Sequence, residues 1–477
     1  MPEESGTYFV SKVVEVSHMD GQDLTKGNIK QELWSLAWPM MLSVFFYTLY
    51  NIVDAYWVGK ISPEAIAAVS ISQITLFVMV SLGFGVTAGS GVIMSMHIGA
   101  KNIPAAERIL GQSFVLSAIL AAVFTVIALV WRNPLLILSG AGGAIFEPAL
   151  SYYTIIAGGS VLLFLMMAVM FAFNMQGDTH GLTKLFALST ALNAILDPIM
   201  IFGWLGFPEM GIAGAAWATL ISQAVFLAVA LRSLQKPHRM VRFRFSALSF
   251  KWASVKKVLD IGFPAALTQV IFPVGLALLT FIVSKAFAEA GAVAFSLGFR
   301  IEFFAYLPAV GFGFAGMAMI GQSVGAGNKE RAREVFGAAL KYASISAAAL
   351  GVVAAIFAHP IISAFTKDVA VFGYAQTYMW SVALVSYGFL AALLVVAQAF
   401  QAIGRSWPGF WLFVLRVGVL TIPLAFLSTR VFDFPILGVW IAVIIGNIVS
   451  AVVGYFWIHR ALRGLDLSHV PVHPMGH

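Results

Sequence analysis

The 477-residue chain contains no cysteine, and only 10% of its residues are charged. The lack of thiols excludes disulfide bonds, thiolate zinc sites, iron–sulfur ligation and cysteine nucleophiles. Soluble proteins carry about 25% charged residues, so 21 acidic and 28 basic side chains are too few to cover a soluble surface of this size. With 60% apolar residues, the composition indicates an integral membrane protein.

The apolar residues form long continuous runs, which excludes the short alternating segments of a membrane β-barrel. A helix needs about 20 apolar residues to cross the hydrocarbon core. The first 32 residues are polar and show no signal-peptide pattern, so the first run is expected to be an uncleaved span. We predict an all-α membrane protein with twelve transmembrane helices, over residues 33–58, 65–96, 107–131, 148–176, 182–204, 211–234, 255–284, 290–324, 335–358, 369–400, 407–429 and 435–459.

Lysine and arginine are distributed unevenly between the two sides of this predicted bundle. Of the 28 basic residues, 21 fall on the side of the termini, five on the other side, and Arg300 and Arg416 inside spans. Because positively charged loops stay in the cytoplasm, both termini are expected there. We therefore expect a multi-pass monomer in the plasma membrane, or the inner membrane of a Gram-negative cell. Orientation alone accounts for the basic loop from Arg232 to Lys257, so no nucleic-acid partner is expected.

The two halves of the chain share landmarks at a nearly constant spacing. Such ordered matches indicate an internal duplication with six spans per copy, related by a pseudo-twofold axis along the membrane normal. Parallel repeats of this kind are typical of transporters. The predicted organisation is a cytoplasmic tail (1–32), an N-lobe (33–234), a basic linker (235–254), a C-lobe (255–460) and a second cytoplasmic tail (461–477). The matched pairs are Pro39 with Pro264, Gly99 with Gly325, Asn102 with Asn328, Gly111 with Gly337, Gly177 with Gly404, and Gly211 with Gly438.

Acidic residues inside the predicted spans are the first candidates for function. Asp54, Asp197 and Glu302 lie well within apolar runs, where an acid costs about 2.5–3.5 kcal/mol on insertion scales and is by default a functional candidate. Tyr50 precedes Asp54 by four residues and Asn193 precedes Asp197 by four, so each pair shares a helix face. Spans one and five both run outward, which places the two aspartates in the outer half of the N-lobe. The alternative is a pair of satisfied acids that fix helix packing.

Further oxygen ligands lie close to these aspartates along the sequence. Pro198 cannot donate a hydrogen bond to the carbonyl of Ala194, which leaves an acceptor beside Asp197. Thr219 adds a hydroxyl from span six. Such a set suits a proton or a hard cation such as Na⁺, with Asp54, Asp197, Asn193 and Thr219 as the Na⁺ ligands in the second case. Beyond the coupling cation, no cofactor is expected.

The substrate cavity is predicted from residues that face the same region. Span four is rich in methionine, whose flexible thioether suits a pocket for varied apolar compounds, although methionine also fills membrane cores. Arg300 and Glu302 are two residues apart and point to different faces, whereas a salt bridge from Glu302 to Arg416 is conceivable. Packing, gating and substrate contact all remain open for these three. The cavity candidates are Asn51, Tyr152, Met170, Asn174 and Arg300.

One motif suggests catalysis and is rejected. Gly321 to Gly325 matches the G-x-S-x-G nucleophile elbow, with His359 as a conceivable base. That elbow requires a strand-to-helix turn, whereas this stretch ends an apolar helix, where glycines four apart serve helix packing. We do not expect an enzyme.

Three stretches resemble the multidrug and toxic compound extrusion (MATE) family. Residues 50–54 (YNIVD) with 56–59 (YWVG) resemble its first helix, 192–199 (LNAILDPI) its fifth and 211–219 (GIAGAAWAT) its sixth. The resemblance extends from about residue 28 to 460. It implies a cation-coupled antiporter in which two lobes alternately open a central cavity and expel amphipathic, often cationic, drugs from the cytoplasm.

The resemblance also implies a branch and a site. In the DinF-like branch the coupling site lies in the N-lobe, matched here by Asp54, Asn193, Asp197 and Thr219, with Tyr50 adjacent, and the first helix bends at the position of Pro39. We expect Pro39 and Pro198 to act as hinges. The NorM-like branch carries acids in spans seven and ten, where this chain has Gln269 and Tyr387. A flippase for a lipid-linked substrate is the alternative, and a channel is disfavoured by the duplication.

Overall fold

The structure is a computed structural model that describes residues 23–237 and 239–465. The outer parts of both predicted tails, residues 1–22 and 466–477, lie outside the described residues. Within the described residues the chain is helical and contains no strand, as the apolar runs predict. Ten of these helices are long and apolar enough to cross a membrane, or eleven with one bent pair counted as a span.

The N-lobe begins with helices whose first turns are capped by side-chain oxygens of Asn28, Ser62, Asn102 and Asp178, as expected for orphan amide groups. Its elements are α2 (Ile29–Gly59), α3 (Pro63–Gly99), α4 (Ile103–Val130), α5 (Arg132–Leu138), η1 (Gly143–Ile145), α6 (Phe146–Gly158), α7 (Ser160–Met175), α8 (Thr179–Phe202), η2 (Trp204–Gly206), α9 (Ile212–Leu234) and η3 (Phe245–Ala247).

The C-lobe contains two π-helical segments as well as α-helices. Its elements are α10 (Trp252–Gly325), α11 (Lys329–Ile356), α12 (Ala358–Phe365), α13 (Val369–Tyr378), the π segment η4 (Met379–Ala383), α14 (Leu384–Ala402), α15 (Ser406–Phe413), the π segment η5 (Val414–Thr421), α16 (Ile422–Arg430) and α17 (Leu437–Arg463). Sequence periodicity did not predict the π segments.

Twelve membrane crossings follow from these elements within the described residues. Helix α10 has 74 residues, about 110 Å at 1.5 Å per residue, and its backbone leaves helical geometry at Phe287 and Ala288; it therefore forms two spans. Helices α6 and α7 form one span bent by 52°, with Gly159 at the break. The pairs α13–α14 and α15–α16 each continue through a π segment.

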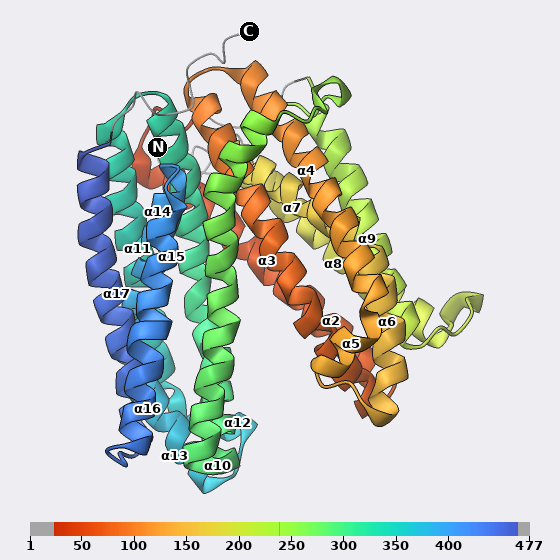
Figure 1. Ribbon diagram of the computed structural model, residues 1–477, viewed down its shortest axis with the longest axis vertical. Helices are drawn as coiled ribbons and strands as arrows, with labels where there is room; N and C mark the ends of the chain where they lie inside the picture. Colours follow the sequence, from red (N-terminus) through yellow and green to blue (C-terminus); the bar gives the residue numbers. More distant parts are fainter. Residues whose placement is uncertain (1–22, 238, 466–477) are drawn as a thin grey trace, which may run out of the picture.

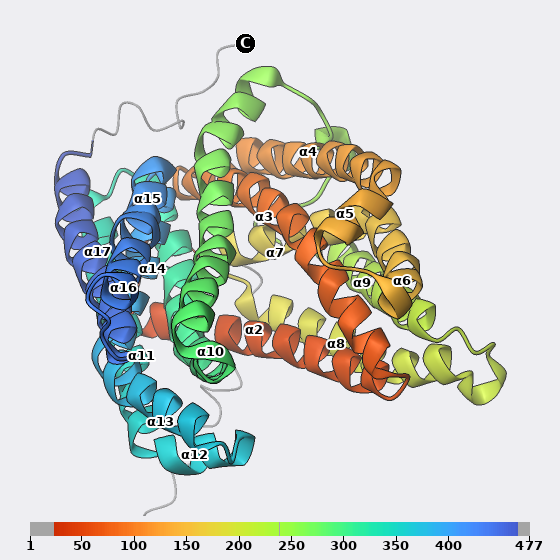
Figure 2. The same cartoon turned by 60° about the horizontal axis from the view of Figure 1, so that its bottom comes forward.

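The twelve spans form two lobes that meet at one end and diverge at the other (Figures 1 and 2). Arg331 Nε donates to the carbonyl of Leu24 (3.0 Å) and Arg333 Nη2 to that of Leu462 (3.5 Å). Both described chain ends therefore lie beside the start of α11, as an even number of crossings requires. We call this the terminal end, and the opposite end, with α5 and α12, the distal end.

Glycines bring the two lobes into backbone contact at the terminal end. A Cβ placed on Gly99 of α3 would lie 1.9 Å from the carbonyl oxygen of Gln322, and one on Gly325 of α10 would lie 1.9 Å from that of Met96. Each residue of one contact is 226 positions from its counterpart in the other. The same backbone contact thus occurs twice, which places the pseudo-twofold axis between α3 and the end of α10.

A short segment before α2 joins the lobes at the same end. Arg331 donates to the carbonyls of Leu24, Lys26 and Gly27. The amide of Leu24 donates to Gln322 Oε1 (3.1 Å), and Gln322 Nε2 donates to the carbonyl of Met175 in the N-lobe (2.9 Å). These bonds reinforce the closed terminal end.

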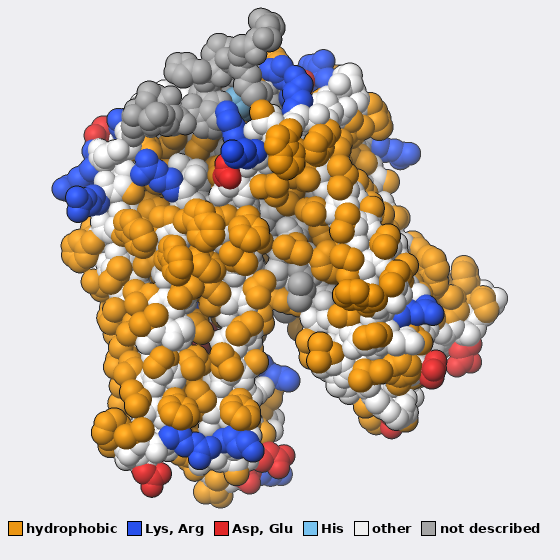
Figure 3. Space-filling view, viewed as in Figure 1, with side chains coloured by type: hydrophobic (Ala, Val, Ile, Leu, Met, Phe, Trp, Pro, Cys, Tyr) orange, Lys and Arg blue, Asp and Glu red, His pale blue; other side chains and the backbone are white. Residues whose placement is uncertain are grey.

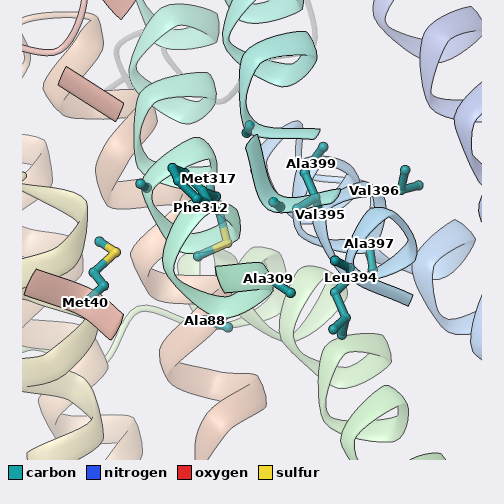
Figure 4. Packing of buried hydrophobic residues seen from close by; sticks show 14 of the residues in the cluster. Met40, Ala88, Ala309, Phe312, Met317, Leu394, Val395, Val396, Ala397 and Ala399 are labelled. Carbon is teal, nitrogen blue, oxygen red and sulfur yellow. The ribbon is translucent and has the colours of Figure 1, made fainter. Parts of the chain in front are cut away.

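The buried core continues from this contact along α3, α10 and α14, which pack together. Figure 4 shows part of it, with Ala88 of α3, Ala309, Phe312 and Met317 of α10, and the stretch from Leu394 to Ala399 of α14. Small side chains let membrane helices approach closely. Apolar side chains also cover the flanks between the two ends (Figure 3), as lipid contact requires.

The segment between the lobes is folded onto the N-lobe. The Arg239 guanidinium bonds the buried carboxylate of Asp178, and Arg244 Nε lies 2.9 Å from Glu107 Oε2. The rings of Phe243 and Phe114 lie 4.7 Å apart. The basic linker predicted over 235–254 is thus ordered by buried contacts with one lobe.

Candidate ion and substrate sites

Helices α2 and α8 are joined in a register that brings Asp54 toward Asp197. Thr183 Oγ1 donates to the carbonyl of Pro39 (2.7 Å), and Thr190 Oγ1 to that of Phe46 (3.1 Å). Each contact joins residues 144 positions apart in the sequence. The second contact lies seven residues after the first on both helices, which is about two helical turns. About two further turns along the same seam lie Asp54 and Asp197. Val58 and Ile201, each one turn beyond one of these aspartates, pack in the same buried cluster.

The two aspartates lie in a buried cluster of oxygen atoms. Asp54 is 4% exposed and Asp197 is fully buried. Asn193 Nδ2 donates to Asp197 Oδ1 (3.0 Å). Among the described residues, five buried oxygens of this region have no hydrogen-bond partner: Tyr50 OH, Asp54 Oδ1, Asn193 Oδ1, Asp197 Oδ2 and Ser222 Oγ. Buried polar atoms are rarely left unpaired, so these oxygens, two of them on carboxylates, are suited to a proton or a bound cation.

The remaining predicted members border this cluster. Thr219 of α9 is buried, and the Tyr50 hydroxyl approaches it without reaching hydrogen-bond geometry. Tyr152 of α6 is also buried and packs in one cluster with Val58 and Ile201. Helices α2, α8 and α9 thus bring together the five predicted residues Asp54, Asp197, Asn193, Thr219 and Tyr50. Helix α6 adds Tyr152 to this group. Two carboxylates, an amide and hydroxyls fit a hard cation such as Na⁺.

The expected hinge prolines lie in uninterrupted helices. Pro39 is buried in α2, and its carbonyl accepts hydrogen bonds from Ser43 Oγ (2.9 Å) and Thr183 Oγ1. Pro198 is buried in α8 beside Asp197. Helix α2 is therefore hydrogen-bonded to α8 at Pro39, the residue that has no backbone N–H to donate within its own helix.

A cavity of about 480 Å³ lies between the two lobes, and we call it the central cavity. Figure 3 shows the cleft between the lobes widening toward the distal end. The N-lobe contributes α2 and α3 side chains, among them Asn51, and the C-lobe contributes mainly aromatic and polar side chains of α10. Its lining residues are Val44, Tyr47, Thr48, Asn51, Phe77, Thr268, Gln269, Phe272, Phe299, Glu302, Phe303, Tyr306, Leu390, Leu394, Phe413 and Arg416.

A smaller cavity of about 190 Å³ adjoins α7, and we call it the N-lobe cavity because most of its lining comes from that lobe; Val310 and Phe314 of α10 also line it. Met166, Met167 and Met170 line it together with Asn174. Of the predicted cavity residues, Asn51 therefore lines the central cavity, Met170 and Asn174 line the N-lobe cavity, and Tyr152 lies beside the aspartates. Arg300 is exposed and lines neither cavity.

The C-lobe holds a second buried polar group, which the sequence revealed only in part. Glu302 and Arg416 form no ion pair within 4 Å among the described contacts. Instead the Tyr378 hydroxyl donates to Glu302, and Arg416 Nε donates to Asn447 Oδ1 (2.6 Å). Tyr378 immediately precedes η4 and Arg416 lies in η5; π-helical turns occur often at functional sites. Tyr378 and Asn447 have no sequence signal beyond their apolar surroundings.

Two six-helix repeats around a central cavity, with buried acids in both repeats, define a secondary transporter of the membrane. The MatE family model matches residues 39–199 and 264–427. The two matched stretches begin 225 residues apart, which is the spacing of Pro39 and Pro264. The chain belongs to the MatE family, a family of transporters and not of enzymes.

Relatives of known sequence and a solved structure are consistent with membership of this transporter family. The chain is 28% identical over 421 residues to the "Probable multidrug resistance protein NorM" of Thermotoga maritima, covering 87% of this chain and 89% of the relative. It is also 28% identical over 441 residues to the "FAD transporter" of Shewanella oneidensis, covering 92% and 97%. A solved MOP superfamily transporter from Pyrococcus furiosus superposes with a TM-score of 0.86 at 26% identity, over 93% of this chain and 98% of that one.

Proposed function

We propose that the protein exports amphipathic organic compounds from the cytoplasm in exchange for H⁺ or Na⁺, with the coupling cation bound at the Asp54–Asp197 cluster. The observation that carries this proposal is the set of buried oxygens without partners around two carboxylates. Because most basic residues lie at the terminal end, we assign that end to the cytoplasm. The structure is then an outward-open state in the plasma membrane, and we expect the monomer to be the functional unit.

The proposed cycle alternates the access of the central cavity. In the outward-open state the aspartate cluster takes up a cation, which favours release of the exported compound. The lobes then part at the terminal end and close at the distal end, and the cation leaves inside. One charge crossing 100 mV supplies about 2.3 kcal/mol, and a tenfold gradient costs about 1.4 kcal/mol, so one ion sustains a gradient of about fifty-fold.

The placement of the acids favours the DinF-like branch. The buried aspartates lie in the N-lobe, whereas Gln269 and Tyr387 occupy the regions where the NorM-like branch carries acids. The relatives are named for multidrug resistance in one case and for FAD in another. Family membership alone therefore leaves the cargo open, and the lining residues are the guide to it.

The second candidate is a flippase for a lipid-linked substrate. A lipid phosphate would call for a strongly basic cavity, whereas the described lining of the central cavity contains one basic residue, Arg416. The exporter is therefore favoured.

Ethidium flux in proteoliposomes tests the proposal. An imposed pH gradient, and separately a Na⁺ gradient at equal pH, should reveal uphill flux with one of the two cations. Asp54→Asn and Asp197→Asn should abolish coupled flux, while Asp260→Asn, which changes an exposed acid of α10, serves as the matched control. Undiminished coupled transport by Asp197→Asn would refute the coupling site, and absence of any wild-type flux would favour lipid cargo.

A further inference from the structure

The C-lobe wall of the central cavity presents a buried cation. Arg416 is 8% exposed, yet it lines the central cavity and also an adjoining pocket of about 50 Å³ beside Glu302 and Tyr378. A guanidinium has five N–H donors, and the described hydrogen bonds use the Nε donor alone, toward Asn447. The Nη groups are thus the part of this side chain that a ligand can engage.

The position of Arg416 is fixed from behind. Asn447 accepts from Arg416 Nε and donates to Ser386 Oγ (3.0 Å), which in turn donates to the carbonyl of Val382 (2.8 Å). This chain of bonds runs from η5 through α17 to α14, so it holds the guanidinium against the cavity wall. A preorganised fork of donors is what recognises a carboxylate or phosphate in two-point geometry.

The neighbouring acid Glu302 does not occupy the Nη groups of Arg416, so they remain available to an anionic ligand. Glu302 lines the same two pockets, but among the described contacts it forms no ion pair with Arg416 within 4 Å. Its carboxylate accepts a hydrogen bond from Tyr378, which holds it apart from the guanidinium. A charge buried without a partner is costly, so an anionic ligand that reaches Arg416 gains more there than at an exposed arginine.

The rest of the cavity wall suits a flat aromatic body. Phe272, Phe299, Phe303 and Tyr306 surround the approach to Arg416, with the ring centroids of Phe272 and Phe299 5.6 Å apart. Aromatic side chains stack on planar ligands over a large area. The cavity volume, about 480 Å³, lies in the range of pockets that enclose drug-sized molecules.

We propose that Arg416 forms an anion-binding subsite of the central cavity, which admits planar aromatic compounds that carry a carboxylate or phosphate group. This inference rests on the proposed export function and names a substrate class for it, opposite in charge to the cationic drugs that the family resemblance implies. Glu302 is a specificity determinant of the same subsite, since its charge opposes the anion.

Two dyes of similar shape and opposite charge test the subsite. Fluorescence anisotropy gives the affinity of the purified full-length protein for 6-carboxyfluorescein, an anion, and for ethidium, a cation. In Arg416→Gln the ratio of carboxyfluorescein to ethidium affinity should fall at least tenfold, and in Glu302→Gln it should rise. Arg430→Gln, which changes an exposed arginine of α16, is the matched control and should leave the ratio unchanged.

Gln269→Glu provides a second test if Arg416→Gln fails to fold, as judged by its elution from size exclusion. This nearly isosteric change adds a negative charge to the cavity lining without altering Arg416, and it should lower the ratio at least tenfold. The inference would be overturned if the affinity ratio were unchanged in folded Arg416→Gln protein. If Arg416→Gln does not fold, an unchanged ratio in Gln269→Glu would overturn it. Wild-type protein that moves ethidium but neither binds nor moves carboxyfluorescein would overturn it too, with the export function intact. Failure of both dyes to move would overturn the export function itself.

Discussion

Alanine at Gly99 or Gly325 should disfavour closure of the terminal end. A Cβ at either position would meet a backbone carbonyl oxygen of the other lobe at 1.9 Å, and a backbone atom cannot move aside as a flexible side chain can. The collision exists only while the lobes touch. Each substitution therefore raises the free energy of the state with a closed terminal end relative to a state in which the terminal end is open.

The size of this effect follows from the cost of overpacking. An extra methyl group in a close-packed interface costs about 1–3 kcal/mol, which corresponds to about a 5- to 150-fold change in the ratio of the two states. Gly99 and Gly325 share one interface, so the double variant should exceed either single variant without reaching their sum. Ethidium flux should fall in all three, because one limb of the cycle becomes less populated.

The absence of cysteine makes the direct measurement simple. Lys184→Cys and Arg463→Cys place two unique thiols at exposed positions of α8 and α17, for spin labels whose distance is measured by pulsed electron paramagnetic resonance. Gly99→Ala should shift the distance distribution toward longer values. Gly337→Ala is the matched control, because a Cβ there meets no atom within 4 Å. An unchanged distribution in Gly99→Ala, with an unchanged melting temperature, would refute the reasoning.

Two further predictions concern the terminal end. Arg239→Gln removes the partner of the buried Asp178 and should lower the free energy of unfolding by about 3–5 kcal/mol. Arg242→Gln changes a half-exposed ion pair and should lower it by at most about 1 kcal/mol. Thermal unfolding in detergent distinguishes the two variants, and equal melting temperatures would contradict the prediction for Arg239. Burial raises the pKa of Asp23, but hydrogen bonds from Lys101 and Thr25 outweigh it and lower the pKa to about 2. An acid of lowered pKa stabilises the fold above its ordinary value and loses that effect as pH falls through about 2. The contact between Lys101 and Asp23 should therefore not titrate between about pH 5 and 8, and the melting temperatures of wild type and Lys101→Gln should differ by the same amount throughout this range. A difference that changes with pH there would contradict the lowered pKa of Asp23.

Much of the fold could be predicted because the bilayer constrains it strongly. Apolar run length gives the spans, and the charge of the loops predicts their direction. The predicted run 148–176 is nevertheless bent by 52° near Gly159, and the run 407–429 contains a π segment around Arg416. Run length alone does not determine local helix geometry, which depends on packing against neighbouring helices.

The candidate site could be predicted from the sequence where its residues lie at helical spacing. Asp54 and Tyr50, or Asp197 and Asn193, are separated by one turn, so each pair is visible in the sequence. The C-lobe group is assembled from residues on four different helical segments, such as Glu302, Tyr378 and Asn447, which share no spacing. Burial and hydrogen bonds across helices bring them together, and one sequence without its fold contains no record of that.

The duplication explains why the two lobes share a frame while their chemistry differs. The glycine contacts recur in both copies because each copy must close against the other. Asp54, by contrast, corresponds to Leu279 at the 225-residue spacing, and Glu302 corresponds to Leu76 at 226. Asp54 and Glu302 thus each lie where the other lobe has a leucine. A cation bound in one lobe and a substrate anion held by the other would then act on the same pair of bodies, and coupling between them requires only that both bias the same closure.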